Sequence, residues 1–163
     1  NNGGDGFVVA RLLAEKGIIV TVVLVDGEPK TTDAITNYQL LADRPVQIVD
    51  MTKSLDVAVS LLKDKAKAPD IVVDAIYGTG FHGELRPAAA TAAEYISKHA
   101  EHAYALDIPS GLTGDMAEGD HLNKGSAKVS ATITFHARKP VHQVAAAREY
   151  CGQIIVADIG IKE

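Results

Sequence analysis

Short apolar segments alternate along this chain with amphipathic segments, and this alternation restricts the possible folds more than any other feature. The clearest apolar segment, Ile18 to Val25, is rich in β-branched residues and is typical of a strand buried on both faces. A helix is expected before it, from Asp5 to Lys16, because Gly17 suits the position just after a helix end. Strands that alternate with helices predict a parallel sheet with right-handed crossovers.

The same pattern continues along the rest of the sequence. Strands are expected at 46–49, 71–77, 103–107, 130–135 and 153–157. Helices are expected from Thr32 or Asp33 through Leu41, stopping before Pro45, after Ser54 through Ala66, from Pro87 to about His99, and from Val141 to Tyr150. The sequence therefore predicts one α/β domain over residues 1–163, with a doubly wound, mainly parallel sheet and helices on both faces.

The composition argues against several classes of protein. The single cysteine, Cys151, cannot form an internal disulfide, so a reducing compartment is expected and the cytoplasm is the predicted location. The net charge of −5 and the lack of a Lys/Arg cluster argue against nucleic-acid binding. The longest apolar run, residues 18–25, is too short to cross a bilayer, so no membrane partner is expected.

The sequence begins with a dense turn pattern, NNGGDG. A glycine-rich loop of this kind normally follows a strand, so we expect that an N-terminal segment and the first strand are missing here. Asn2 and the three glycines readily adopt positive φ, and their backbone N–H groups, with a helix start at Asp5, suit a phosphate or another anion. A tight turn that only caps the helix is the alternative. The loop lacks Gly-x-Gly-x-x-Gly spacing, which argues against a conventional nicotinamide dehydrogenase.

Two further loops carry reactive side chains after predicted strands. Asp74 lies in an apolar strand, where an ionised carboxylate needs a cation or several donors, although a purely structural role is the alternative. His82, in the glycine-rich loop that follows, is by itself typical of a solvated residue. Asp107 ends another strand and leads into a proline turn that contains Ser110. Because ligands of open α/β sheets bind outside the carboxyl ends of strands, these loops form the predicted site.

Oxygen atoms from the three loops are candidates for a metal site. Asn2, Asp74 and Ser110 supply amide, carboxylate and hydroxyl or carbonyl oxygens, which are the ligands of hard cations such as K⁺, Na⁺ or Mg²⁺. Zinc is disfavoured because Cys151 is alone and the six histidines show no ligand spacing.

The motifs of these loops, in this order, resemble the NAD(P)H-hydrate epimerase family, the YjeF N-terminal domain. They are NNGGDGFVVARLL at 1–13, DAIYGTGFHGELR at 74–86 and DIPSGL at 107–112, supported by TITFHARK at 132–139 and GQIIVADIGI at 152–161. The resemblance covers essentially the whole chain. It implies a Rossmann-like fold and an isomerase that interconverts the R and S epimers of hydrated NADH and NADPH, NAD(P)HX, in the repair of nicotinamide cofactors.

The sequence departs from the family pattern in three places. The N-terminal strand is absent, residues 112–115 are less acidic than is common in the family, and His136 and Arg138 stand where smaller residues are common. The missing strand bears on independent folding more than on the site residues.

The resemblance also implies roles for individual residues. A K⁺ ion would be held by Asn2, Asp74 and Ser110. The substrate would contact Asn1, Asn2, Gly3, Gly4, Asp5, Gly78, Thr79, Gly80, Phe81, His82, Gly83, Glu84 and Asp107. Asp107 is the candidate catalytic proton donor and acceptor. Arg138 and Lys139 are candidates for binding the 2′-phosphate of NADPHX.

Partners follow from the same resemblance. Family members often form homodimers, and their product passes to an ADP- or ATP-dependent NAD(P)H-hydrate dehydratase. The alternative function is a non-catalytic nucleotide-binding or protein-interaction module of the same fold. The presence of Asn2, Asp74, Asp107 and Ser110 favours the enzyme.

Overall fold

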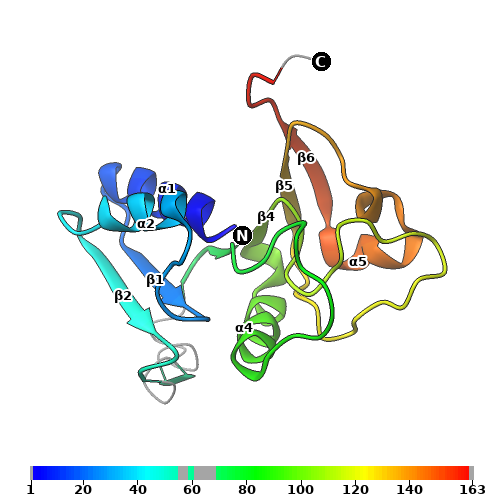
Figure 1. Ribbon diagram of the computed structural model, residues 1–163, viewed down its shortest axis with the longest axis horizontal. Helices are drawn as coiled ribbons and strands as arrows, with labels where there is room; N and C mark the ends of the chain where they lie inside the picture. The colour runs from blue at the N-terminus through cyan, green and yellow to red at the C-terminus, as the bar shows by residue number, and fades with distance from the viewer. Residues whose placement is uncertain (1, 55–58, 61–68, 162–163) are drawn as a thin grey trace. The chain divides into compact units, whose positions relative to one another are not determined.

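The computed structural model describes residues 2–54, 59–60 and 69–161 of the chain. The chain divides into two compact units, residues 3–69 and residues 1–2 with 70–163. Each unit has its own parallel sheet, and each is described by itself (Figure 1). The helix predicted after Ser54 falls mostly on residues outside the described ranges.

The unit of residues 3–69 is built from two helix–strand pairs. Its elements are α1 (Gly3–Glu15), β1 (Val20–Leu24), α2 (Thr32–Gln39) and β2 (Val46–Asp50). The strands β1 and β2 run parallel, with Val20 opposite Val46. Both helices contribute to one apolar core, in which the rings of Phe7 and Tyr38 lie 5.2 Å apart.

Most element boundaries in this unit differ from the sequence prediction by one or two residues; α2, for example, ends at Gln39, before the predicted Leu41. Helix α1 begins at Gly3 rather than Asp5, and strand β1 begins at Val20 rather than Ile18. The later strand start follows from the helix cap: Gly17 has φ 78°, its N–H bonds to Ala14 O, and the Ile18 N–H bonds to Leu13 O. This is a Schellman cap, which uses Ile18 to close the helix instead of pairing it in the sheet. Ile18 and the residue after it are consequently exposed.

The second unit contains a four-stranded parallel sheet in the order β3-β4-β5-β6. Its strands are β3 (Val72–Asp74), β4 (Ala103–Leu106), β5 (Ala131–Phe135) and β6 (Gln153–Ala157). Helix α4 (Pro87–Lys98) and the short 3₁₀ helix η2 (Ala100–His102) connect β3 to β4. Asp74 pairs with Ala105, and Leu106 pairs with Ile133, so the carboxyl ends of β3, β4 and β5 meet at one edge of the sheet.

Two apolar clusters hold this unit together. In the first, Ala93 and Ile96 of α4 pack against Ala103 and Ala105 of β4. Small alanines on both surfaces allow the helix to approach the sheet closely. The second cluster gathers residues of the turns that precede β6 with Ile108 and Leu112 from the loop after β4. That long loop is therefore anchored to the core, and this fixes the segment from Asp107 to Ser110.

The helix predicted from Val141 to Tyr150 is wrong. The segment instead forms the 3₁₀ helices η3 (Pro140–Gln143) and η4 (Ala145–Ala147), followed by the one-turn helix α5 (Arg148–Cys151). Val144 between them is extended, with φ −70° and ψ 124°. The buried residues Val141, Val144, Ala147 and Tyr150 are spaced by three, which matches the three-residue turn of a 3₁₀ helix and not the α-helical repeat.

Candidate active site at the carboxyl edge of the four-stranded sheet

Asp74, at the end of β3, is a fully buried carboxylate (0% exposed). Its Oδ2 accepts a hydrogen bond from Ser110 N (2.7 Å), while Oδ1 accepts from Ser110 Oγ (2.6 Å) and Ile76 N (3.3 Å). Burial raises the pKa of Asp74, and these hydrogen bonds oppose the rise. Within the described ranges, no lysine or arginine forms an ion pair with Asp74, so the compensation of its charge comes from dipoles alone.

Ser110 connects two of the predicted loops. Besides its two hydrogen bonds to Asp74, its Oγ accepts one from Tyr77 N (3.0 Å). The turn depends on Gly111, which has φ 100° and whose added Cβ would lie 2.7 Å from Ser126 Oγ. Only glycine combines that backbone conformation with so little space. The DIPSG turn therefore places the serine hydroxyl and N–H against the buried carboxylate.

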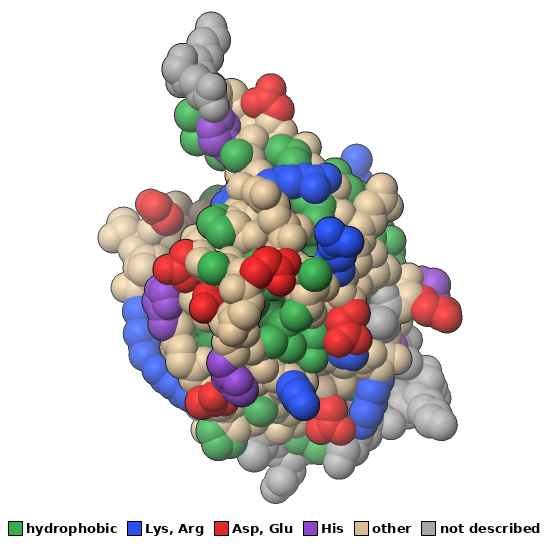
Figure 2. Space-filling model, turned by 90° about the vertical axis from the view of Figure 1, so that its right-hand side faces the viewer, with side chains coloured by type: hydrophobic (Ala, Val, Ile, Leu, Met, Phe, Trp, Pro, Cys, Tyr) green, Lys and Arg blue, Asp and Glu red, His purple; other side chains and the backbone are tan. Residues whose placement is uncertain are grey.

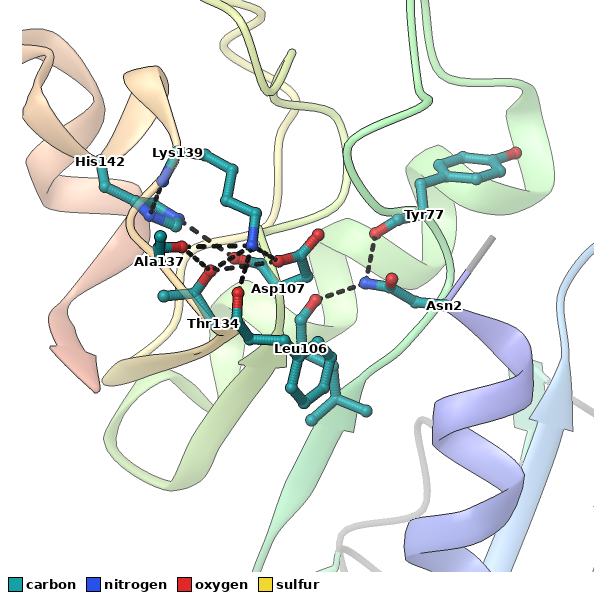
Figure 3. A network of polar contacts seen from close by, with 9 residues as sticks. Asn2, Tyr77, Leu106, Asp107, Thr134, Ala137, Lys139 and His142 are labelled. Atoms are coloured by element: carbon teal, nitrogen blue, oxygen red, sulfur yellow. Dashed lines mark hydrogen bonds and ion pairs between the residues drawn. The ribbon is translucent and has the colours of Figure 1, made fainter. Parts of the chain in front are cut away.

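Asn2 is also buried (5% exposed), and its side chain lies between two strand ends (Figure 3). Its Nδ2 donates to the backbone carbonyls of Tyr77 (3.1 Å) and Leu106. Gly78 packs directly on this amide, because an added Cβ would lie 2.9 Å from Asn2 Cγ. The glycine after Tyr77 thus lets the loop close over the asparagine.

Asp107, the first residue after β4, has φ 67°, a left-handed conformation that is uncommon for a residue other than glycine. Its N–H bonds to Ile133 O (2.7 Å), and its carbonyl lies 3.1 Å from His142 Nε2. Its carboxylate Oδ1 accepts from Thr134 Oγ1 (3.1 Å) and pairs with Lys139 Nζ (2.6 Å). Asp107 is thus held in an uncommon backbone conformation by several hydrogen bonds at the carboxyl end of β4. Such strained residues cluster at active sites, so Asp107 is a candidate catalytic group.

The residues at this edge have the chemistry of hard-cation ligands. The buried carboxylate of Asp74 has no cationic partner among the described side chains, and the carbonyls of Tyr77 and Leu106 converge on the Asn2 amide. With Ser110 Oγ these groups supply oxygen atoms of the kind that hard cations prefer, with one formal charge among them. Among the described residues, no group of three or more His, Cys, Asp and Glu side chains is arranged to hold a metal ion.

The glycine-rich loop after β3 is mostly exposed. Thr79, Gly80, His82, Gly83 and Glu84 all lie at the surface, as expected for residues that contact a ligand or solvent. The rings of Phe81 and Tyr77 stack at 4.7 Å with an interplanar angle of 15°, and Phe81 N bonds to Gly78 O. The stack and this hydrogen bond connect Phe81 to the start of the loop.

The predicted N-terminal loop is helical instead of irregular. Gly3, Gly4 and Asp5 form the first turn of α1 in the other unit, and none of the described glycines before Gly17 has positive φ. The expected positive φ is therefore not adopted by Gly3, Gly4 or Gly6, which are helical. The positive end of the helix dipole at an N-terminus still favours an anion, so binding of an anion at these residues stays a prediction. Asn1 lies outside the described residues.

The structure thus bonds Asp74 directly to Ser110 and connects Asn2 to this pair through the backbone of Tyr77. It also adds partners of Asp107 that sequence reasoning missed. These are Thr134, Lys139 and His142. Lys139 had been a candidate for a 2′-phosphate, but its ammonium is bound to Asp107 and to backbone carbonyls. A usable signal was present: a lysine a few residues beyond β5 lies at the same sheet edge as Asp107.

The surface around this unit carries mixed charges. On the face shown in Figure 2, acidic and basic side chains are interspersed with apolar ones. No helix among the described residues is both long and apolar enough to span a membrane. Cys151 is buried, and burial raises the pKa of its thiol to about 12.

The fold and the site together define an α/β protein with parallel sheets and an oxygen-lined site at a strand edge. Comparison with known proteins identifies the family: the chain belongs to the family of the YjeF-related protein N-terminus, whose model matches residues 1–141. The resemblance inferred from the motifs is confirmed.

Several curated relatives align over almost the whole chain. A protein from Archaeoglobus fulgidus named bifunctional NAD(P)H-hydrate repair enzyme Nnr is 37% identical, and the match covers 100% of this chain and 31% of the relative. NAD(P)H-hydrate epimerases from Pirellula staleyi and Nitrosopumilus maritimus are 36% and 34% identical. Each of these two matches covers 99% of this chain, with 69% and 70% of the respective relative. The chain therefore spans about a third of the bifunctional enzyme.

The crystal structure of the yeast protein ynu0 has the same fold. Its TM-score to this chain is 0.71 at 20% identity, and the match covers 96% of this chain and 61% of the yeast chain. The predicted fold class, an α/β protein with parallel sheets and helices, is confirmed.

Proposed function

We propose that this chain is an NAD(P)H-hydrate epimerase, an isomerase that interconverts the R and S forms of NAD(P)HX. The names of the relatives agree with this activity. The observation that carries the proposal is Asp107, a carboxylate held at φ 67° at the strand edge beside the buried Asn2–Asp74–Ser110 cluster. We further propose that both units belong to one epimerase domain, because the family match runs through both.

The reaction needs a group that can give and take a proton. NAD(P)HX carries a hydroxyl on C6, next to a ring nitrogen whose lone pair can help to expel it. Asp107 in its acid form donates a proton to this hydroxyl, the C6–O bond breaks, water leaves, and the nitrogen lone pair forms an iminium. Water then adds to the other face of C6, and the proton that it loses restores the acid form of Asp107.

The Asn2–Asp74–Ser110 cluster is the proposed K⁺ site. K⁺ bound there would supply a fixed positive charge that offsets the charge of Asp74 and of an anionic nucleotide. Residues of the chain hold the loops in place. Ser110 bonds the DIPSG turn to Asp74 of β3, and the Asn2 amide donates hydrogen bonds to the carbonyls of Tyr77 and Leu106. Asp107 lies in the same connection between β4 and the turn, so this cluster also positions the proposed catalytic carboxylate.

Substrate contacts are proposed at both glycine-containing segments. Backbone N–H groups at the start of α1, in Gly3, Gly4 and Asp5, suit phosphate oxygens, as expected for a helix N-terminus. The loop 78–84, which is exposed except at Gly78 and Phe81, suits the remainder of the nucleotide. Arg138, which is exposed, stays a candidate for a 2′-phosphate. This use of backbone donors explains how a chain with net charge −5 could bind an anion.

The proposed partners follow from the relatives. A bifunctional repair enzyme that is longer than this chain favours a functional link to an ADP/ATP-dependent NAD(P)H-hydrate dehydratase. A homodimer is proposed on the family resemblance alone.

The test is direct conversion of purified R-NADHX, with the S epimer followed by chromatography. We expect the unmodified chain to bring the epimers to equilibrium and Asp107→Asn to slow this by about 10²–10⁴-fold, the usual contribution of a general acid–base group. A folded Asp107→Asn variant with an unchanged rate would remove Asp107 from the mechanism. If the unmodified chain binds NAD(P)HX without converting it, that result favours the alternative of a non-catalytic binding module.

A further inference from the structure

Lys139 is the nearest charged neighbour that the structure gives to Asp107. Its Nζ lies 2.6 Å from Asp107 Oδ1 and donates to Phe135 O (2.8 Å) and Thr134 Oγ1 (3.0 Å). The Ala137 carbonyl lies within reach as well, at 3.2 Å (Figure 3). The ammonium is thus surrounded by oxygen atoms and holds one orientation.

This ion pair differs from the surface pairs of the same unit. The side chains of Lys139 and Asp107 are 23% and 10% exposed, whereas those of Lys128 and Glu149, which pair at 2.8 Å, are 41% and 64% exposed. A lysine gives up rotamer freedom and hydration when it is fixed in this way. Because less water screens it, the Lys139–Asp107 pair has a stronger electrostatic attraction than the exposed Lys128–Glu149 pair, and this attraction offsets that cost.

Lys139 and Asp107 are joined a second time, through their backbones. The N–H of Lys139 donates to His142 Nδ1 (3.0 Å), so Nδ1 carries no proton, and Nε2–H donates to the Asp107 carbonyl (3.1 Å). Burial lowers the pKa of His142, which favours this neutral ring. The histidine thus links the chain before η3 to the residue with the strained backbone.

The two oxygens of the Asp107 carboxylate are used differently. All the hydrogen bonds and ion pairs that described residues make with it go to Oδ1, from Thr134 Oγ1 and Lys139 Nζ. This leaves Oδ2 for a substrate hydroxyl. The Lys139 ammonium beside Oδ1 stabilises the negatively charged carboxylate that Asp107 becomes once it has donated its proton.

We propose that Lys139 is a positioning residue of the site, which holds Asp107 through Oδ1, turns Oδ2 towards the substrate and compensates the negative charge that forms on the carboxylate when it donates its proton. This inference rests on the proposed epimerase function. Because Lys139 acts through Asp107 and not on the nucleotide, its removal should affect turnover more than binding.

The test compares Lys139→Met, which keeps length without charge, with Lys139→Arg, and uses Lys128→Met as the matched control. We expect Lys139→Met to lower kcat by about 10- to 100-fold while KM changes less than about threefold, as for other groups that orient a reacting residue. Lys139→Arg should recover part of the loss, and Lys128→Met should behave as the unmodified chain. Circular dichroism and thermal unfolding establish that each variant is folded.

The outcomes separate the two proposals. An active chain whose kcat is unchanged by Lys139→Met overturns the assignment of Lys139 and leaves the epimerase function standing. A rise in KM alone also overturns it, because Lys139 would then bind substrate. If Lys139→Met does not fold, Lys139→Arg decides: an arginine variant that folds with full loss of kcat and no recovery contradicts the charge role. An unmodified chain that converts no NAD(P)HX refutes the epimerase function, and the role of Lys139 in that reaction with it.

Discussion

The contact of Gly78 with Asn2 predicts a large difference between two glycine-to-alanine substitutions in one loop. In Gly78→Ala, the added methyl group would lie 2.9 Å from Asn2 Cγ and 3.2 Å from Nδ2. The asparagine must move, and its bonds to the carbonyls of Tyr77 and Leu106 are lost. In Gly80→Ala, the added methyl group meets nothing within 4 Å. The pair therefore separates steric contact with the site from the general effect of alanine.

The magnitude follows from the groups involved. Two hydrogen bonds at about 1 kcal/mol each are lost, and overpacking adds about 1–3 kcal/mol. Alanine offsets about 0.4–1 kcal/mol by restricting the unfolded chain. We expect Gly78→Ala to lower the free energy of unfolding by about 3 kcal/mol, which is a fall in Tm of about 6–12 °C for a chain of this size.

Urea unfolding and calorimetry measure this difference, and the epimerase assay adds a functional readout. Gly80→Ala should unfold within about 0.5 kcal/mol of the unmodified chain, since that is the range of ordinary surface substitutions. Equal stabilities for Gly78→Ala and Gly80→Ala would refute the reasoning, because Asn2 would then be free to leave its place without loss.

Two further predictions concern buried titratable groups. Burial lowers the pKa of His142 from 6.5, so the folded state resists protonation of this ring. As the pH falls below 6.5, the unmodified chain should therefore lose free energy of unfolding relative to His142→Gln. The loss is at most about 1.4 kcal/mol per pH unit. Urea unfolding between pH 8 and 5 checks this, and a difference independent of pH would contradict it. Burial raises the pKa of Cys151 to about 12, so its thiol should react with iodoacetamide only as fast as the chain opens. Rapid labelling without denaturant, compared with labelling in urea, would show that the thiol is accessible.

Local pattern predicted most of the elements. The strands at 46–50, 131–135 and 153–157 lie within a residue of the expected ranges, because β-branched apolar runs between turns mark buried parallel strands. Pro87 marked the start of α4, since proline suits the first helical turn. The prediction of a helix from Val141 to Tyr150 is wrong because the buried apolar residues there repeat every three positions, which is the repeat of 3₁₀ turns.

For the candidate site as well, one part could be predicted from the sequence and another part could not. Asp74, Asp107 and Ser110 are predicted from the sequence because an acid or hydroxyl at the carboxyl end of an apolar strand lies where parallel sheets bind their ligands, and their roles stay predictions. The partners of Asp107 were not found. Lys139 lies 32 positions further along the chain, and only the pairing of β4 with β5 brings the two together.

The sequence by itself therefore determined which residue types stand at the ends of the strands, since hydrophobic periodicity and turn residues are local properties. Tertiary structure decided what each polar group contacts. The carboxylate of Asp74 is compensated by Ser110 and Ile76, the carboxylate of Asp107 by Lys139, and the Asn2 amide bridges two strand ends. Such pairings depend on sheet register and on the course of loops anchored in the core, and neither can be read from a stretch of neighbouring residues.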